Sequence, residues 1–380
     1  MWFNDYMIQQ KAYKFRFYPT RDQIEQLNRE FGHARFVWNH ALGLRSKAYR
    51  RRGESINYVG LSKHFTHLKK QTAFAWLKDA TASCLTQKLI DLDKAFKGFF
   101  QGQADYPRFK KKQHRQAVRY QLDQRIVASN YRAGEFLKLP KLGALAIKWS
   151  QVPAGTPKMV TVTKTAAGRY FVTFMCEVEI QPLEKTNRAV GIDVGIKDVA
   201  VTSDGFFAGA PKYSYRHHRK LKRAQRTLAR MQKGSNHWRR QRLKVARLHE
   251  KIANSRQDFL HKLTTWLIRR YDILCLEDLN VAGMLKNRRL ARAIADVGLH
   301  KLKTYLEYKA QWYGREIRII DRWFPSTKTC SACGKQHAMP LHKRVMKCDC
   351  GLEMDRDQNA AINILTAGLA GCGATYPQAA

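Results

Sequence analysis

The sequence predicts a multidomain α+β protein, in which a small β-barrel with a helical insertion is followed by an α/β domain that carries a cluster of cysteines. Short, mostly alternating apolar runs separated by Gly and Pro fill residues 120–182 and are typical of β-structure. Apolar residues at helical spacing precede them, and from residue 189 strand patterns alternate with helical ones. At 380 residues with 44% hydrophobic content, the chain can form two or three separate cores.

The first strand is expected at residues 7–18, where basic residues alternate with aromatic and apolar ones until Pro19. Thr20 then suits a helix N-cap. Apolar residues follow at helical spacing: Ile24, Leu27, Phe31, Ala34, Val37, Trp38 and Ala41. A second helical region is predicted over about residues 60–100, and a basic loop follows it.

We infer that the first strand joins the later β-structure, which makes the helices between them an insertion. This predicts a β-barrel domain formed by residues 1–19 and 119–184, interrupted by a helical domain at residues 20–118. A short linker then leads into a third domain at residues 185–380.

The third domain begins with two expected strands, residues 190–194 and 199–202, around a tight turn, and Asp204-Gly205 is a further hairpin signal. The stretch 216–256 is strongly basic and carries two apolar seams, so it predicts a helical hairpin with basic outer faces. Residues 271–276 form an apolar run of buried-strand type.

The charge of the chain indicates a polyanionic partner. Lys and Arg number 70 against 30 Asp and Glu, giving a formal net charge of +40. Such an excess repels itself in a compact fold, and nucleic acid would neutralise it with release of counterions. A merely soluble basic protein is the plain alternative. We expect no membrane association, because neither a signal-peptide pattern nor a bilayer-length apolar run is present.

Three acids stand at positions where burying a carboxylate costs free energy. Asp193 interrupts an apolar strand, Glu277 ends a buried one, and Asp357 opens the last helix on its packed face. Converging carboxylates raise one another's pKa, and divalent cations such as Mg²⁺ relieve the repulsion. Two such ions can activate water and stabilise the leaving oxygen in phosphodiester hydrolysis. Taken singly, each acid also fits a structural role: a turn residue, a cap or ion-pair partner, and an N-cap respectively.

Four of the eight cysteines are bunched, Cys330, Cys333, Cys348 and Cys350. A C-x-x-C followed by a C-x-C suits tetrahedral Zn²⁺ with four protein ligands, which is a structural and not a catalytic arrangement. The shortened second half leaves open that His337 or His342 replaces one ligand. A disulfide or free thiols are the alternative.

The three acidic segments resemble the successive RuvC motifs of the TnpB family and of the related type V CRISPR effector nucleases. They are residues 191–195 (GIDVG), 276–280 (LEDLN) and 355–364 (DRDQNAAINI). The N-terminal segments 11–19, 31–39 and 106–110 resemble the family as well. The resemblance assigns the catalytic acids to Asp193, Glu277 and Asp357, which would ligate Mg²⁺. Asp355 is the ambiguous neighbour, and Asp357 is preferred because the family's acid is followed two residues later by Asn.

The resemblance also implies the function. It implies a prokaryotic, cytoplasmic, monomeric RNA-guided endonuclease for double-stranded DNA, with a guide RNA derived from a transposon end. Residues 1–19 and 119–184 become a wedge-like domain, 20–118 a recognition domain and 185–380 an RNase H-like (RuvC) nuclease domain. A zinc ribbon at about residues 324–354 would help to hold target nucleic acid. In the family, the segment after the second motif, residues 281–297 here, acts as a lid.

Candidate contacts to nucleic acid follow from position and chemistry. Tyr58, Ser83 and Gln87 are candidate readers of a short target-adjacent motif, because Gln can bond adenine and Tyr can stack on bases. Gln87 could equally be an ordinary surface residue of a helix. Candidate phosphate contacts are Lys14, Arg16, Arg108, Lys110, Lys111, Lys220, Arg223 and Arg226, any of which could instead be solvated.

Two other functions remain open from the sequence. One is a nucleic-acid-binding regulator that uses the same RNA without cutting, against which the intact acids argue. The other is a transposase proper, against which the lack of a tyrosine nucleophile motif argues. Magnesium-dependent cleavage of a guide-matched plasmid separates the nuclease from the regulator, and joined products would indicate a transposase.

Overall fold

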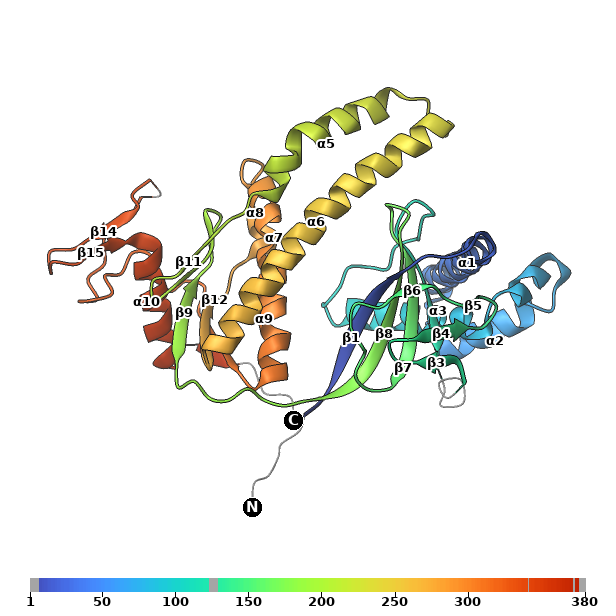
Figure 1. Cartoon of the computed structure of the whole chain (residues 1–380), viewed down its shortest axis with the longest axis horizontal. Helices are drawn as coiled ribbons and strands as arrows, with labels where there is room; N and C mark the ends of the chain where they lie inside the picture. The colour runs from blue at the N-terminus through green and yellow to red at the C-terminus, as the bar shows by residue number, and fades with distance from the viewer. Residues whose placement is uncertain (1–6, 123–128, 341, 372, 376–380) are drawn as a thin grey trace, which may run out of the picture. The chain divides into compact units, whose positions relative to one another are not determined.

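The computed structural model describes residues 7–122, 129–340, 342–371 and 373–375 of a chain with mixed α/β architecture (Figure 1). Two compact units are present, one of residues 8–178 and one built mainly from residues 179–380. Within the described ranges, none of the helices has the length and apolar character that crossing a membrane would require.

The first unit is built on a five-stranded sheet in the order β2-β7-β8-β1-β6, which curls into a half-barrel (Figure 1). Its strands are β1 (Met7–Phe17), β2 (Gln116–Gln121), β6 (Ile147–Lys148), β7 (Pro157–Lys164) and β8 (Tyr170–Ile180). A small second sheet has the order β3-β4-β5, with β3 (Tyr131–Arg132), β4 (Phe136–Leu139) and β5 (Gly143–Ala144). The structure therefore gives a curled half-barrel sheet where the sequence predicts a small barrel.

Strand β1 confirms the alternation expected for residues 7–18. Tyr13, Phe15 and Phe17 are buried in the core of the sheet, whereas Lys14 between them is exposed. Because β1 lies between β8 and β6, the inferred joining of the first strand to the later β-structure is confirmed, and the helices between β1 and β2 are an insertion.

The insertion consists of α1 (Arg21–Arg52), α2 (Tyr58–Leu68), the short 3-10 helix η1 (Thr72–Asp79) and α3 (Ala82–Phe100). Thr20 is the N-cap of α1, as expected, and forms a capping box with Gln23. The wholly buried carboxylate of Glu30 accepts hydrogen bonds from the backbone N–H (3.0 Å) and hydroxyl (2.7 Å) of Thr81, the N-cap of α3. This buried contact fixes α3 against α1.

The second unit contains a six-stranded sheet in the order β11-β10-β9-β12-β13-β16. Its strands are β9 (Ala189–Asp193), β10 (Asp198–Thr202), β11 (Phe207–Gly209), β12 (Ile273–Glu277), β13 (Glu316–Ile320) and β16 (Gly373–Thr375). Strands β9, β12 and β13 are parallel, and the other neighbours are antiparallel. The strands predicted at residues 190–194, 199–202 and 271–276 are confirmed to within a few residues, as is the hairpin at Asp204-Gly205.

The helices of this unit are α5 (Tyr213–Arg230), α6 (Asn236–Arg270), α7 (Val281–Met284), α8 (Ala291–Val297), α9 (Leu299–Tyr313) and α10 (Arg356–Leu369). Helices α6 and α9 lie on one face of the sheet and α10 on the other (Figure 1). The expected basic helical hairpin is confirmed as α5 and α6, with Ser235 as the N-cap of α6. Helix α6 continues to Arg270, well past the predicted end, because its last turns pack into the core.

A glycine sets how closely α10 approaches the sheet. A Cβ at Gly191 of β9 would lie 2.0 Å from the carbonyl oxygen of Ala361 and 2.5 Å from the backbone nitrogen of Leu365, both in α10. Neither neighbour is a side chain that could rotate away. The helix therefore packs on β9 with backbone against backbone, and only glycine fits at this position.

We expect Gly191→Ala to destabilise the second unit strongly. Overpacking of a rigid contact typically costs about 1–3 kcal/mol, and a clash between backbone atoms lies at or above the upper end. Gly43→Ala is the control, because a Cβ at Gly43, inside α1, would meet no atom within 4 Å and alanine favours helix. Thermal unfolding should show a large loss for the first variant and no loss for the second. Equal stability of the two variants would contradict the close packing.

Candidate functional site

The three predicted acids converge at one edge of the second sheet. Side chains alternate along β9 and β12, so Asp193 and Glu277, which end these parallel strands, share the face of the sheet that carries Gly191 and α10. The register that pairs Leu276 with Ile192 brings the two strand ends side by side. Asp357 lies in the first turn of α10, which packs on β9.

Asp193 is partly buried and lies within the influence of the other two carboxylates. Burial and the charges of Glu277 and Asp357 together raise the pKa of Asp193 to about 7, against a backbone hydrogen bond from Val194 and the charge of Arg356. Burial also raises the pKa of Glu277, which accepts a short hydrogen bond from the Ser326 hydroxyl. A divalent cation with oxygen ligands would remove this repulsion.

Asp355 and Asp357 have different environments. Asp355 is the N-cap of α10, since its carboxylate accepts from the backbone N–H groups of Asp357 (2.8 Å) and Gln358 (3.2 Å). Asp357 instead meets the Nε and Nη2 atoms of Arg356, both 3.2 Å from its Oδ1, and Arg344 at 3.6 Å from its Oδ2. The alternative in which Asp357 serves as the N-cap is therefore not what the structure shows.

The four bunched cysteines form a compact group whose sulfur atoms all lie within 4.8 Å of one another, a spacing that could hold one metal ion. Cys330 and Cys333 precede the hairpin of β14 (Val345–Lys347) and β15 (Glu353–Asp355), and Cys348 and Cys350 lie in its turn. The Sγ–Sγ distances are 3.7 Å for Cys330–Cys350 and 3.5 Å for Cys333–Cys348. These sulfurs do not form a disulfide, so the disulfide alternative is not what the structure shows.

Two cysteines of the group have opposite pKa shifts, and one histidine lies beside them. Against a backbone hydrogen bond from Cys350, burial and hydrogen bonds with the neighbouring thiols raise the pKa of Cys348 to about 12. Although burial raises the pKa of Cys330, backbone N–H groups of Cys333 and Ala332 donate to its sulfur and lower the pKa to about 7. Such N–H donation suits a metal-bound thiolate. His337 lies with its Nε2 3.1 Å from the Cys348 sulfur, whereas the exposed His342 is not in the group.

Two asparagines that sequence reasoning missed join the cysteine loop to the last helix. Asn359 accepts from the backbone N–H of Ser331 (2.9 Å) and donates to the carbonyl of Thr329 (2.7 Å). Asn363 donates to the carbonyls of Ser326 (2.8 Å) and Thr329 (2.6 Å). Both side chains are buried. The signal was available, since Asn359 and Asn363 are polar residues on the packed face of a helix.

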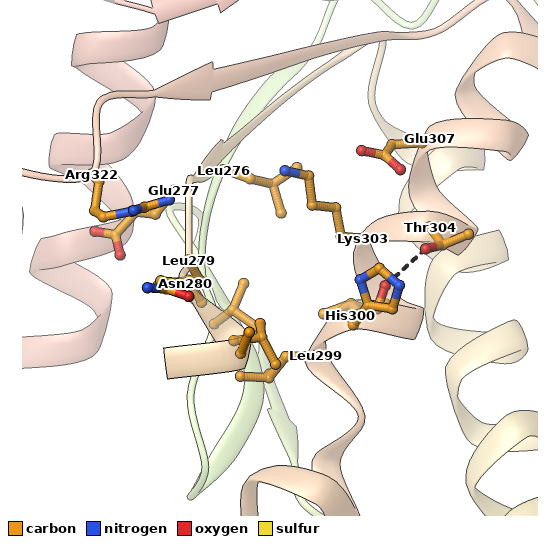
Figure 2. Close-up of a pocket in the computed structure, with 14 residues that line it drawn as sticks. Leu276, Glu277, Leu279, Asn280, Leu299, His300, Lys303, Thr304, Glu307 and Arg322 are labelled. Atoms are coloured by element: carbon orange, nitrogen blue, oxygen red, sulfur yellow. Dashed lines mark hydrogen bonds between the residues drawn. The ribbon is translucent and has the colours of Figure 1, made fainter. Parts of the chain in front are cut away.

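A pocket of about 450 Å³ adjoins the carboxylate edge, and Figure 2 shows the residues that line it. Glu277 and Arg322 lie on one side, with His300, Lys303 and Glu307 of α9 across the pocket. Arg322 donates to the carbonyl of Asp278 (3.0 Å) and forms an ion pair with its carboxylate. Ser326 and Arg322 thus hold the end of β12, and neither was singled out in the sequence.

The candidate motif readers lie in the helical insertion. Ser83 and Gln87 are one turn apart on α3, and Tyr58 begins α2. Tyr58 and Ser83 are half-buried, whereas Gln87 is only 7% exposed, so it is not an ordinary surface residue. The structure does not show these side chains in contact with one another.

The candidate phosphate contacts differ in how they are held. Lys14 lies over the ring of Phe171, Arg16 over Tyr18 and Lys110 over Trp38, with cation-to-centroid distances of 4.3, 4.9 and 4.0 Å. Arg108 is exposed and pairs with Asp105 at 3.0 Å, and Lys111 is exposed. Three more lie exposed on α5: Lys220, Arg223 and Arg226.

Three family models match parts of the chain. Residues 173–288 match a model of the OrfB proteins of IS605 described as "Probable transposase", and residues 300–364 match "Cas12f1-like, TNB domain". Residues 7–54 match "Helix-turn-helix domain", a stretch that in this structure is β1 and the single helix α1.

Relatives match over almost the full length. A Streptomyces pristinaespiralis protein named "Putative RNA-guided DNA endonuclease" is 43% identical over 375 residues, covering 97% of this chain and 92% of the relative. The Escherichia coli K12 protein "Putative RNA-guided DNA endonuclease InsQ" is 33% identical, covering 96% and 94%. A solved structure, "Cryo-EM structure of the Cas12f1-sgRNA-target DNA complex", shares the fold with a TM-score of 0.59 at 14% identity, covering 94% of this chain and 98% of that one.

The raised pKa of Asp193 predicts how pH affects stability. Between its ordinary value of 3.8 and about 7, the folded state holds a proton that the unfolded state has released, so stability falls as pH rises through this window. Asp193→Asn cannot ionise. In buffer without divalent cations at about pH 8, we expect the variant to be more stable by up to about 4 kcal/mol.

The gain in stability should shrink as pH falls and vanish below about pH 4, where both proteins are uncharged at this position. Thermal unfolding of the two proteins across this range measures it. A variant less stable than the wild type at about pH 8 would show that the cluster does not repel as described.

Proposed function

Because the chain belongs to the TnpB family, we propose that it is an RNA-guided endonuclease that cuts double-stranded DNA at a Mg²⁺-dependent RuvC-type site. The observation that carries the proposal is the convergence of Asp193, Glu277 and Asp357 at one sheet edge, with the pKa of Asp193 raised by burial and by the other two. Relatives named as RNA-guided DNA endonucleases over nearly the whole chain support it.

The donor set of the carboxylate edge fits Mg²⁺, which prefers oxygen ligands, and we propose that Asp193, Glu277 and Asp357 hold two such ions. When bound, these ions supply an activated water and stabilise the leaving oxygen of the phosphodiester. Ser326 holds Glu277 in its orientation through the hydroxyl hydrogen bond. Arg344 and Arg356 flank Asp357, and Arg344, which is exposed, is placed to meet a phosphate approaching this edge.

We propose that the cysteine group holds one structural Zn²⁺ in a ribbon at about residues 324–354. Four sulfur ligands leave no open position, so the ion would serve folding and not hydrolysis. Through Asn359 and Asn363, a fixed cysteine loop would also fix the start of α10 and with it Asp357. The ribbon therefore supports the catalytic edge as well as the target-binding role that the family suggests.

The remaining parts of the chain are proposed to serve guide and target. A wedge-like domain (1–19 and 119–184) and a recognition domain (20–118) would read the target-adjacent motif through Tyr58, Ser83 and Gln87. Residues 185–380 form the nuclease domain of a monomer. The exposed basic face of α5 suits the guide RNA, because phosphate contacts release counterions.

We expect Asp193→Ala to abolish cleavage of a plasmid that matches the guide RNA, while binding of RNA and target persists. The reason is that the carboxylate serves the reaction, and its removal relieves repulsion within the fold. Glu277→Gln and Asp357→Ala should behave alike. Asp258→Asn is the matched control, because Asp258 forms an exposed pair with Lys262 on α6. Cleavage is measured with the purified RNA complex in Mg²⁺.

Three other outcomes are informative. Near wild-type cleavage by Asp193→Ala would overturn the catalytic assignment. Guide-directed binding by the wild type without cleavage would indicate the regulator, and joined DNA products the transposase. Cutting of DNA without RNA would leave only a non-specific nuclease.

We expect one zinc ion per chain by elemental analysis of protein purified without chelator. Cys330→Ser and Cys350→Ser should lose it and destabilise the second unit, since structural zinc contributes roughly 10–16 kcal/mol of binding free energy in small peptide sites. Cys176→Ser, at a buried cysteine of β8, is the control that should retain the metal. His337→Ala should also retain it, and loss of zinc there would make His337 a ligand. Absence of zinc in the wild type would refute the site.

A further inference from the structure

Trp323 has the highest exposed fraction among the large exposed hydrophobic side chains of the described residues, with 84% of its surface accessible. An indole is normally buried, because removing its large apolar surface from water is favourable. An indole exposed to this degree is a candidate contact for a binding partner, and its surroundings indicate which kind.

The backbone that carries Trp323 is fixed. Its N–H donates to the carboxylate of Asp321 at 2.8 Å, and the next N–H, of Phe324, donates to the Asp321 carbonyl at 3.2 Å. Phe324 packs against a small core that contains Ile320 and Ile364. The indole is therefore presented by a turn that the fold holds in place, not by a loose loop.

The same turn is anchored to the catalytic strand at both ends. Arg322, just before Trp323, donates to the carbonyl of Asp278 and pairs with its carboxylate. Ser326, three residues after it, donates to Glu277. These two acceptors are consecutive residues at the end of β12. Since Ile320 of β13 lies opposite Glu277, the turn leaves the sheet at the edge where the carboxylates converge.

The chemistry around this indole favours nucleic acid over a protein surface. A protein-docking face needs a contiguous apolar patch, whereas Trp323 follows a cationic residue, Arg322, in a chain of formal charge +40. Aromatic rings combined with positive charge are how proteins hold single strands, with bases stacked on the rings. A stacked base would cover the indole, and Arg322 would lie near the adjoining backbone.

We propose that Trp323 is a positioning residue whose indole stacks on a nucleobase of the DNA strand beside the bond to be cut. The inference rests on the proposed nuclease function and adds to it the group that fixes the strand over the carboxylates. Stacking places the phosphodiester without contacting the reacting atoms, so Trp323 acts through the position of the substrate.

Because Trp323 is highly exposed, its substitution can be tested for an effect on activity without a loss of stability. Truncation removes almost no internal packing, so Trp323→Ala should unfold within a degree or two of the wild type, as surface substitutions do. In the full chain with its co-purified guide RNA, cleavage of guide-matched DNA should fall by roughly 10- to 100-fold, the usual effect of losing one stacked base. Trp323→Phe should retain most of the activity. Phe100→Ala is the control, because Phe100 is 72% exposed at the end of α3 in the other unit.

An abasic nucleotide placed in turn at each position near the cut identifies the stacked base. At one position the missing base should slow the wild type as much as Trp323→Ala slows cleavage of intact DNA. The two losses should not add when combined, because both remove the same contact. Full additivity at every position, or wild-type cleavage by Trp323→Ala, would refute the proposal.

The combination of Trp323→Ala with abasic DNA can also be tested without cleavage. The quantity measured is then the affinity of a single-stranded DNA oligonucleotide for the RNA-bound protein in Mg²⁺-free buffer. Failure of the wild type to cleave would count against the proposed nuclease function alone. Stacking would still be supported if Trp323→Ala binds the intact oligonucleotide more weakly than the wild type does, while the two proteins bind the abasic oligonucleotide equally. Equal affinity of wild type and variant for the intact strand would refute it.

Discussion

The contact between α10 and β9 at Gly191 is the constraint on which the candidate site depends. It brings a helix backbone against a strand backbone with no side chain between them. One turn toward the start of the same helix stands Asp357, and two residues along the same strand stands Asp193. A larger residue at position 191 would lift the helix from the sheet and separate the two carboxylates. Close packing here therefore makes the carboxylate cluster possible.

The carboxylates at this edge of the sheet repel one another, and the rest of the fold holds them together. A chain with 70 basic residues could have neutralised three acids with Lys or Arg, yet the pKa of Asp193 is raised and not lowered. The arginines near the cluster, Arg344 and Arg356, contact Asp357, and the charge of Arg356 lowers the pKa of Asp193 by less than burial and the other two acids raise it. This is the arrangement expected where charge compensation is left to bound cations, and functional sites commonly keep such unfavourable local electrostatics.

The segment between β13 and α10 links the two candidate metal centres. It begins with the turn of Trp323, continues through Ser326 to the cysteines, and returns through β15 to the N-cap of α10. Asn359 and Asn363 bond back to this segment from the helix. Hydrogen bonds thus connect the segment that carries the cysteines to Glu277 through Ser326, and to the helix that carries Asp357 through Asn359 and Asn363.

The sequence by itself determined most secondary-structure elements and the positions of the acids whose burial costs free energy. Alternation in β1, the cap at Thr20, the basic hairpin and the buried strand ending at Glu277 are local patterns, and a carboxylate within an apolar run is conspicuous in any context. Tertiary structure alone decided what those residues meet. That Asp355 caps the helix while Asp357 joins the cluster depends on the docking of α10, and the burial of Gln87 on its neighbours. The half-barrel, the asparagine bonds and the exposure of Trp323 also arise from contacts between distant segments, which no local periodicity encodes.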